Sequence, residues 1–283
     1  MPNPSNSSER PGPDDSAITA AWLIVGVIYL TLFWGRVVCY LPQPFDRWGQ
    51  LARPTLAAWL RDSPWLWLVA HIVIGVVIPG VVLAAFHRKL TDVGLGPPNV
   101  LGRRMTLVGA LLSIPFGLWL MRVYPSLALR SLGTHDICSL LVMIPEHFLI
   151  CGVYVALFLP GRRLSKTIPQ APIEGKATLR ALCWLGLAQP PTSETADPVV
   201  AWFGLTRRSL LAVVVSGALF CLVHVGKETL EAALSFPGGV AVAYVTLRSR
   251  SIWPAIIAHW AMNLIPLALL AAFGWTTVPV QPG

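Results

Sequence analysis

The chain has 283 residues, of which 55% are hydrophobic and only 12% are charged. This is about half of the charged fraction usual in soluble globular proteins, so the composition predicts an all-α, polytopic integral membrane protein. A net charge of +8 does not indicate nucleic-acid binding, because the 21 Lys and Arg residues are scattered between apolar segments and form no dense basic stripe. The cysteines have no CxxC spacing, so we expect buried thiols rather than a disulfide framework or a zinc ribbon; they are Cys39, Cys138, Cys151, Cys183 and Cys221.

The first half of the chain predicts a polar tail followed by three membrane helices in an N-terminal unit of residues 17–136. Residues 1–16 are rich in Pro, Ser and acidic side chains, and we expect them to be disordered. The apolar run Ala17–Tyr40 is too long for the h-region of a signal peptide and is expected to remain as helix 1. Two further apolar runs, Pro64–Phe86 and the shorter Met105–Met121, predict helices 2 and 3.

Histidines in this half have a structural interpretation. His71 lies inside helix 2, where a packed or water-facing histidine is commoner than a ligand. His135 and Asp136 come just before the fourth apolar run, and a solvated helix start explains them better than a catalytic relay.

The second half predicts four more helices, in a core of residues 137–275 that precedes a short tail of residues 276–283. The expected helices are Ile137–Leu159, Ser209 to about Val225, about Ala232 to Leu247, and Ile252 to about Trp275. We expect Pro237-Gly238-Gly239 to interrupt the third of them near its start, because proline and glycine break helices.

A long basic loop of residues 160–208 separates helices 4 and 5, and its apolar patch Ala181–Ala188 could lie on the membrane surface. With the N-terminus in the cytoplasm, most of the 21 basic residues fall on the cytoplasmic side of seven spans. The positive-inside rule therefore favours this orientation, and we expect a multi-pass protein of the bacterial cytoplasmic membrane.

The fourth apolar run carries Glu146 at its middle. A carboxylate at mid-bilayer is costly unless it is paired, and marks a functional site by default. The chain offers few buried polar partners for it: His224 in helix 5, and His259 with Asn263 in helix 7. The sequence predicts that these four residues converge on one buried catalytic centre.

The chemistry of these side chains suits amide hydrolysis. Glu146 and His224 can hold and deprotonate a water molecule, since a desolvated carboxylate is a competent general base near neutral pH. His259 and Asn263 are four residues apart and share a helix face, so both can donate hydrogen bonds to the oxygen that becomes negative when the water attacks a peptide carbonyl.

Three blocks of sequence, each in an apolar helix, carry a resemblance. In order they are the block that begins at Glu146, Phe220-Cys-Leu-Val-His224 and His259-Trp-Ala-Met-Asn263. The approach to the last block contains Phe236-Pro-Gly-Gly239. This order resembles the CPBP family of intramembrane endopeptidases, which includes CAAX prenyl endopeptidases, Abi proteins and bacteriocin-processing proteins. The resemblance covers roughly residues 137–270. It implies a membrane-embedded protease of the glutamic type, historically described as a metalloendopeptidase, whose catalytic carboxylate is Glu146.

The resemblance also implies a membrane-associated protein or peptide as substrate, with a CAAX-type end, a leader peptide or a C-terminal sorting signal, and no nucleic acid. The first block departs from the family pattern Glu-Glu-x-x-x-Arg, because it contains Glu146-His147-Phe-Leu-Ile-Cys151. The second Glu has become His147 and the Arg has become Cys151. We expect His147, Cys151 and Phe220 to support the site.

Alternatives remain open from the sequence. A Cys151 thiolate activated by His147 could act as the nucleophile of a sorting transpeptidase, although a small buried thiol is the simpler interpretation. Glu146, His224 and His259 could bind zinc, but the helix lacks HExxH and we expect no cofactor. A degenerate, non-catalytic family member that acts in immunity, as a scaffold or in transport is the third alternative.

Overall fold

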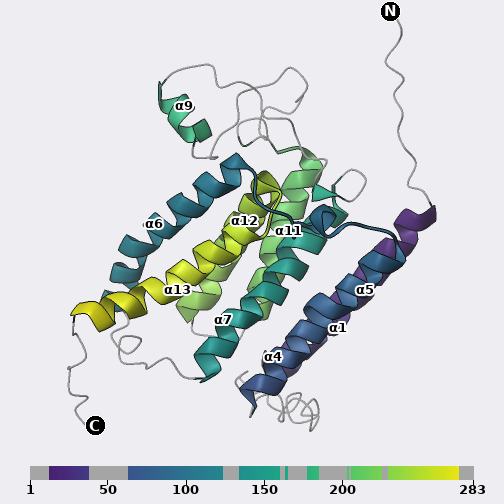
Figure 1. Ribbon diagram of the computed structural model, residues 1–283, viewed down its shortest axis with the longest axis horizontal. Coiled ribbons are helices and arrows are strands. Elements are labelled where there is room, and N and C mark those ends of the chain that lie inside the picture. The colour runs from purple at the N-terminus through teal and green to yellow at the C-terminus, as the bar shows by residue number, and fades with distance from the viewer. Residues whose placement is uncertain are drawn as a thin grey trace, which may run out of the picture.

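The computed structural model describes residues 13–37, 63–123, 134–159, 163–164, 177–184, 203, 205–224 and 229–273. In these residues every regular element is a helix, and seven long helical segments lie side by side (Figure 1). They are α1 (Pro13–Val37), α4-η2-α5 (Pro64–Ile72, Val73–Val77 and Ile78–Ala85), α6 (Val100–Val123), α7-η5-α8 (Thr134–His147, Phe148–Tyr154 and Val155–Leu157), α11 (Arg207–His224), α12 (Thr229–Ser249) and α13 (Trp253–Phe273). The short elements are η3 (Leu90–Val93) and α9 (Ala177–Trp184). The predicted all-α class is confirmed.

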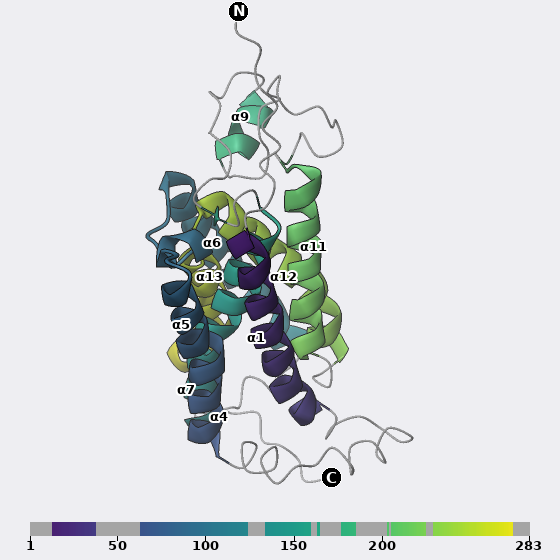
Figure 2. The ribbon, with the colours of Figure 1, turned by 90° about the vertical axis from the view of Figure 1, so that its right-hand side faces the viewer.

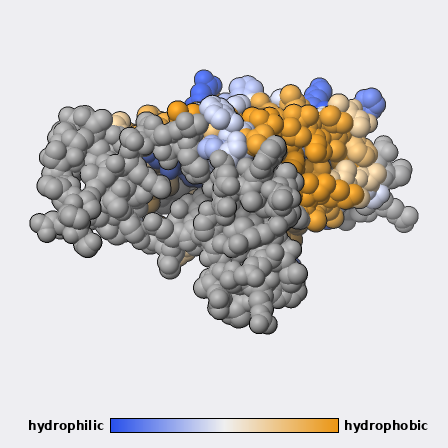
Figure 3. Space-filling model, turned by 90° about the horizontal axis from the view of Figure 1, so that it is seen from below, coloured by the Kyte–Doolittle hydropathy of each residue, from blue (hydrophilic) through white to orange (hydrophobic). Residues whose placement is uncertain are grey.

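The outer surface of the bundle is apolar. Large hydrophobic side chains such as Leu23, Val81, Leu112 and Leu211 are more than half exposed, and a broad hydrophobic face covers the side of the molecule where α1 and α4-η2-α5 lie (Figure 3). Three segments, Pro64–Ala85, Ile137–Leu157 and Arg207–His224, are long and apolar enough to cross a bilayer. The chain is a membrane protein, and its seven long segments are roughly consistent with the predicted seven spans.

Two helices, α1 and α6, begin at least four residues earlier than predicted. α1 starts at Pro13, inside the tail that was expected to be disordered, since proline suits the first helical position and acidic residues at 14 and 15 favour a helix N-terminus. α6 starts at Val100 rather than Met105, because Asn99 caps it: Oδ1 of Asn99 accepts a hydrogen bond of 2.7 Å from the Gly102 amide. The basic residues Arg103 and Arg104 are therefore helical, and the third span is not short.

The predicted interruption at Pro237-Gly238-Gly239 is wrong, because α12 is a continuous helix from Thr229 to Ser249. The glycine serves packing instead. A Cβ on Gly239 would lie 2.6 Å from Cβ of Phe220 and 2.9 Å from Cα of Gly217, and a Cβ on Gly217 would lie 3.2 Å from the Phe236 carbonyl oxygen. Both glycines therefore let α11 and α12 approach at backbone distance.

One end of the bundle contains most of the Lys and Arg residues that the structure describes. The start of α6, the end of α12 and the connections after α5 and α8 all lie there, and α9 lies beyond them in both views (Figures 1 and 2). Hydrogen bonds join this end together: Asn99 Nδ2 donates to the Arg248 carbonyl at 2.9 Å, and Ser251 Oγ donates to the Gly96 carbonyl at 2.7 Å. The described Lys and Arg at this end are Arg88, Lys89, Arg103, Arg104, Arg163, Arg180, Arg207, Arg208, Arg248 and Arg250.

The long basic loop contributes α9 to this end. The Arg104 guanidinium lies 5.1 Å from the centre of the Trp184 ring, a cation–π contact that holds α9 against the start of α6. The rest of the predicted apolar patch, residues 185–188, lies outside the described residues, as do the tails at 1–12 and 274–283. His135 and Asp136 occupy the first turn of α7, and their side chains are outside the described set.

Candidate active site

Glu146 lies in the middle of the fourth span and is buried, with 8% of its surface exposed. The preceding Pro145 packs tightly on the second span, since a Cβ on Gly75 would lie 2.7 Å from Cβ of Pro145 and 3.2 Å from Cε2 of Tyr29. The buried Tyr29 hydroxyl of α1 is within electrostatic range of the Glu146 carboxylate. Residues of the two N-terminal spans thus form one side of the environment of Glu146.

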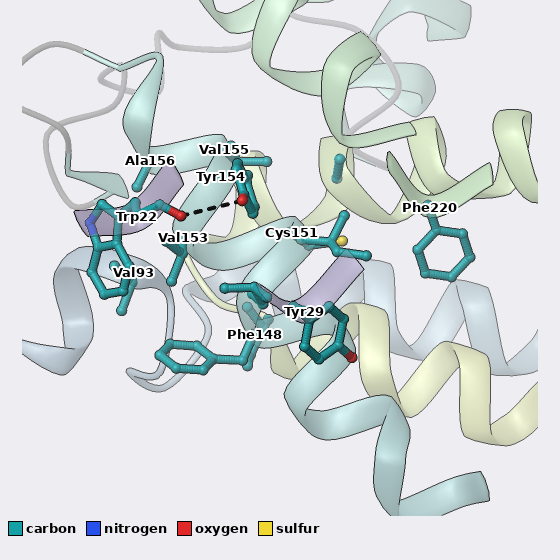
Figure 4. Close-up of a cluster of buried hydrophobic side chains, with 14 of the residues drawn as sticks. Trp22, Tyr29, Val93, Phe148, Cys151, Val153, Tyr154, Val155, Ala156 and Phe220 are labelled. Atoms are coloured by element: carbon teal, nitrogen blue, oxygen red, sulfur yellow. Dashed lines mark hydrogen bonds between the residues drawn. The ribbon is translucent and has the colours of Figure 1, made fainter. Parts of the chain in front are cut away.

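The helix changes register directly after Glu146 and His147. Phe148–Tyr154 form the π-helix η5, whose hydrogen bonds join residues five apart. Segments of this kind are frequent at functional sites. Ser216 of α11 supports η5, because its Oγ donates to the Ile150 carbonyl at 2.9 Å. The side chains of η5 form the centre of the buried core, together with Trp22 and Tyr29 of α1 (Figure 4).

Three histidine rings surround Phe220. The Phe220 ring stacks on His224 with centroids 4.6 Å apart, meets His147 edge-to-face at 5.6 Å, and lies 6.0 Å from His259. His147 comes from α7, Phe220 and His224 from α11, and His259 from α13. The cluster therefore joins three long helices, and one of its members, His147, directly follows Glu146 in the sequence. Phe220, at its centre, packs against Gly239 of α12.

Hydrogen bonds to carbonyl oxygens assign the protons on two of these rings. Nδ1 of His224 lies 2.8 Å from the Phe220 carbonyl oxygen, and Nδ1 of His147 lies 2.8 Å from that of Met143. A carbonyl oxygen only accepts, so both Nδ1 atoms carry hydrogen. In a neutral ring the proton is then absent from Nε2, and Nε2 of His224 is an acceptor, as water activation requires.

The last predicted pair lies on α13. Nδ1 of His259 is 3.4 Å from Nε2 of His147, and the two rings have centroids 5.2 Å apart. Asn263 follows one turn later and is exposed. One of its two amide hydrogens is donated to the His259 carbonyl at 2.8 Å, and the second can be donated to another group.

The sequence left open a Cys151 nucleophile and a zinc ion as alternatives. The proposed partners His147 and Cys151 are not hydrogen-bonded. The two ring nitrogens of His147 face Met143 and His259, and the polar neighbour of the thiol is Ser216 Oγ at 3.9 Å, whose shorter hydrogen bond goes to the Ile150 carbonyl. The change to π-helical register after His147 explains why a spacing of four does not join them. For zinc, the described residues contain no group of three His, Cys, Asp or Glu that could hold a metal ion.

Sequence reasoning missed Tyr29 and Ser216. Neither belongs to a motif, and each reaches the fourth span only through tertiary packing. His71 is the packed histidine that we expected: it is buried, its Nδ1 donates to the Trp67 carbonyl at 2.7 Å, and its ring meets Tyr29 edge-to-face at 5.6 Å.

Replacement of Cys151 by serine should leave catalysis intact, because the thiol is completely buried and has no histidine partner. The matched control is Cys138→Ser, which changes another completely buried thiol on the same span. We expect both variants to retain activity per folded molecule and to show similarly small losses of thermal stability in detergent. Loss of activity in Cys151→Ser alone would establish the thiol as a nucleophile.

Comparison with family models gives a match to the description "Type II CAAX prenyl endopeptidase Rce1-like", over residues 179–265. The matched part contains Phe220, His224, His259 and Asn263, whereas Glu146 lies before it. Comparisons with curated proteins and with solved structures give no match. Residues 179–265 are therefore similar to the Rce1-like CAAX endopeptidases, which is consistent with the predicted resemblance to the CPBP family.

Proposed function

We propose that the chain is an intramembrane endopeptidase that hydrolyses a peptide bond of a membrane-associated substrate, with a water molecule activated by Glu146 and His224. The observation that carries the proposal is the convergence of His147, His224 and His259 around Phe220, in a chain whose residue before His147 is the buried Glu146. Burying several polar side chains among apolar spans costs free energy that a purely structural helix contact does not require. Function accounts for that cost.

Both hydrogens of the water have a partner in the proposed step. One hydrogen stays on the oxygen and forms a hydrogen bond to Nε2 of His224, while Glu146 removes the other as a proton when the water oxygen bonds to the carbonyl carbon. The carbonyl oxygen becomes an oxyanion near His259 and Asn263. When the carbonyl re-forms, the C–N bond breaks and Glu146 returns its proton to the leaving nitrogen. The products are one carboxylic acid and one amine.

The substrate is proposed to carry a CAAX-type end, a leader peptide or a C-terminal sorting signal, in line with the Rce1-like match. We further propose that the basic end of the bundle faces the cytoplasm of a bacterial cell, because the positive-inside rule favours Lys and Arg on that side. This orientation also puts the start of α1 in the cytoplasm, since it lies at the same end (Figure 1).

A comparison of protein termini in membranes tests the proposal. Cells carry the wild-type chain, His224→Asn or His87→Asn. In His224→Asn the new side-chain amide can replace Nδ1–H as donor to the Phe220 carbonyl but has no acceptor at the Nε2 position, so water activation is lost. His87→Asn makes the same replacement in a turn with φ of 50°, which asparagine tolerates.

We expect new peptide termini with the wild type and with His87→Asn, and their loss with His224→Asn. These termini also give the cleavage sequence. Identical termini in all three membranes, with all three chains expressed and folded, would contradict proteolysis and support the non-catalytic alternative.

A further inference from the structure

We propose that His147 is a positioning residue that holds His259 in its Nδ1–H tautomer, so that Nε2 of the neutral His259 ring carries a lone pair instead of a proton. The inference rests on two consecutive hydrogen bonds, one between the Met143 carbonyl and His147 and one between His147 and His259. It deepens the proposed function, on which its catalytic meaning depends, whereas the tautomer itself can be measured without any activity.

The Met143 carbonyl determines which atoms donate in these two hydrogen bonds. The Met143 carbonyl can only accept, so Nδ1 of His147 is the donor over the 2.8 Å that separates them. A neutral His147 ring therefore has no hydrogen on Nε2. Nε2 of His147 lies 3.4 Å from Nδ1 of His259. A hydrogen bond between these two atoms therefore needs the hydrogen to be on Nδ1 of His259.

Burial favours the neutral form that this argument needs. His147 is completely buried, at 0% exposure, and the Phe220 ring that it meets is also stacked on His224. A charged His147 would have to be desolvated beside other histidines, which is costly. The Phe220 ring meets His147 edge-to-face and limits its rotation, so that the acceptor remains directed toward α13.

The tautomer decides what His259 can do. A lone pair on Nε2 can accept a hydrogen bond, but it cannot donate one to a developing oxyanion unless the ring first gains a second proton. Of the two residues, Asn263 can then donate a hydrogen bond without first taking up a proton. It does so through the amide hydrogen that is not bonded to the His259 carbonyl. The two residues of the His-x-x-x-Asn motif thus have different roles.

Nitrogen NMR of ¹⁵N-histidine-labelled protein in detergent micelles tests the inference, because the two tautomers give different Nδ1 and Nε2 shifts. The histidine signal that disappears in His259→Gln belongs to the His259 ring. We expect the wild-type His259 signal to be that of the Nδ1–H form. In His147→Phe, which keeps an aromatic ring and removes the acceptor, the signal should shift to the Nε2–H form. His147→Gln, whose side-chain oxygen can accept, should restore the Nδ1–H signal.

His71→Phe is the matched control, because His71 is also buried and also donates Nδ1–H to the carbonyl four residues earlier, but on a different span. It should leave the His259 signal unchanged. An Nε2–H signal for His259 in the wild type would overturn the inference, and so would an Nδ1–H signal that persists in His147→Phe. Because the wild-type spectrum alone can refute it, the test stands if one variant fails to fold and if proteolysis is never found.

Discussion

Replacing Glu146 by glutamine should lower the rate of peptide hydrolysis by about 10²–10⁴-fold, the usual contribution of a general base. Glutamine has nearly the same shape and fits the buried position, but its amide cannot take a proton from water. The fold should therefore survive while the chemistry is lost. The measurement is the cleavage rate per folded molecule of the purified protein, with a peptide that spans the site identified from the new termini.

Asp92→Asn is the matched control. It also neutralises a buried carboxylate, which lies 3.6 Å from the Arg163 guanidinium at the basic end of the bundle and far along the chain from the proposed site. We expect Asp92→Asn to lower thermal stability and to retain the cleavage rate. A near-normal rate in Glu146→Gln would remove the carboxylate from the mechanism, whatever the effect of the control.

Hydropathy predicted most of the fold because a bilayer requires each span to satisfy its own backbone hydrogen bonds as a helix. The errors occurred where a local signal was weighed wrongly. Asn99 is an ordinary N-cap of α6, but the predicted helix began only after the basic residues Arg103 and Arg104. Pro237-Gly238-Gly239 was taken as a break, although glycines in membrane helices often serve close packing between spans.

The sequence named the candidate residues of the site but not the contacts between them. Polar residues in apolar runs are rare enough to indicate function, which singled out Glu146, His224, His259 and Asn263. The pairing of His147 with His259, at 3.4 Å, could not be foreseen, because it depends on the relative rotation of α7 and α13. The same holds for Tyr29, which reaches the environment of Glu146 from α1.

The packing of α11 on α12 makes the site sensitive to a single methyl group. Gly239→Ala should lower the free energy of unfolding by about 1–3 kcal/mol, the usual cost of overpacking. The added Cβ would lie 2.6 Å from Cβ of Phe220 and 2.9 Å from Cα of Gly217. The second of these atoms is backbone and cannot turn aside, so the helices must separate or Phe220 must move. Either change also disturbs the ring that stacks on His224 at 4.6 Å.

Gly238→Ala supplies the matched control, because it changes the neighbouring glycine of the same helix, where a Cβ would meet nothing within 4 Å. Alanine is the better helix former by about 1 kcal/mol, so this variant should be as stable as the wild type or more stable. Thermal unfolding in detergent and the cleavage rate separate the two variants. Equal stability of Gly239→Ala and Gly238→Ala would mean that α11 and α12 are not in backbone contact. A stable Gly239→Ala protein without activity would instead show that the glycine matters chiefly for the position of Phe220 and His224.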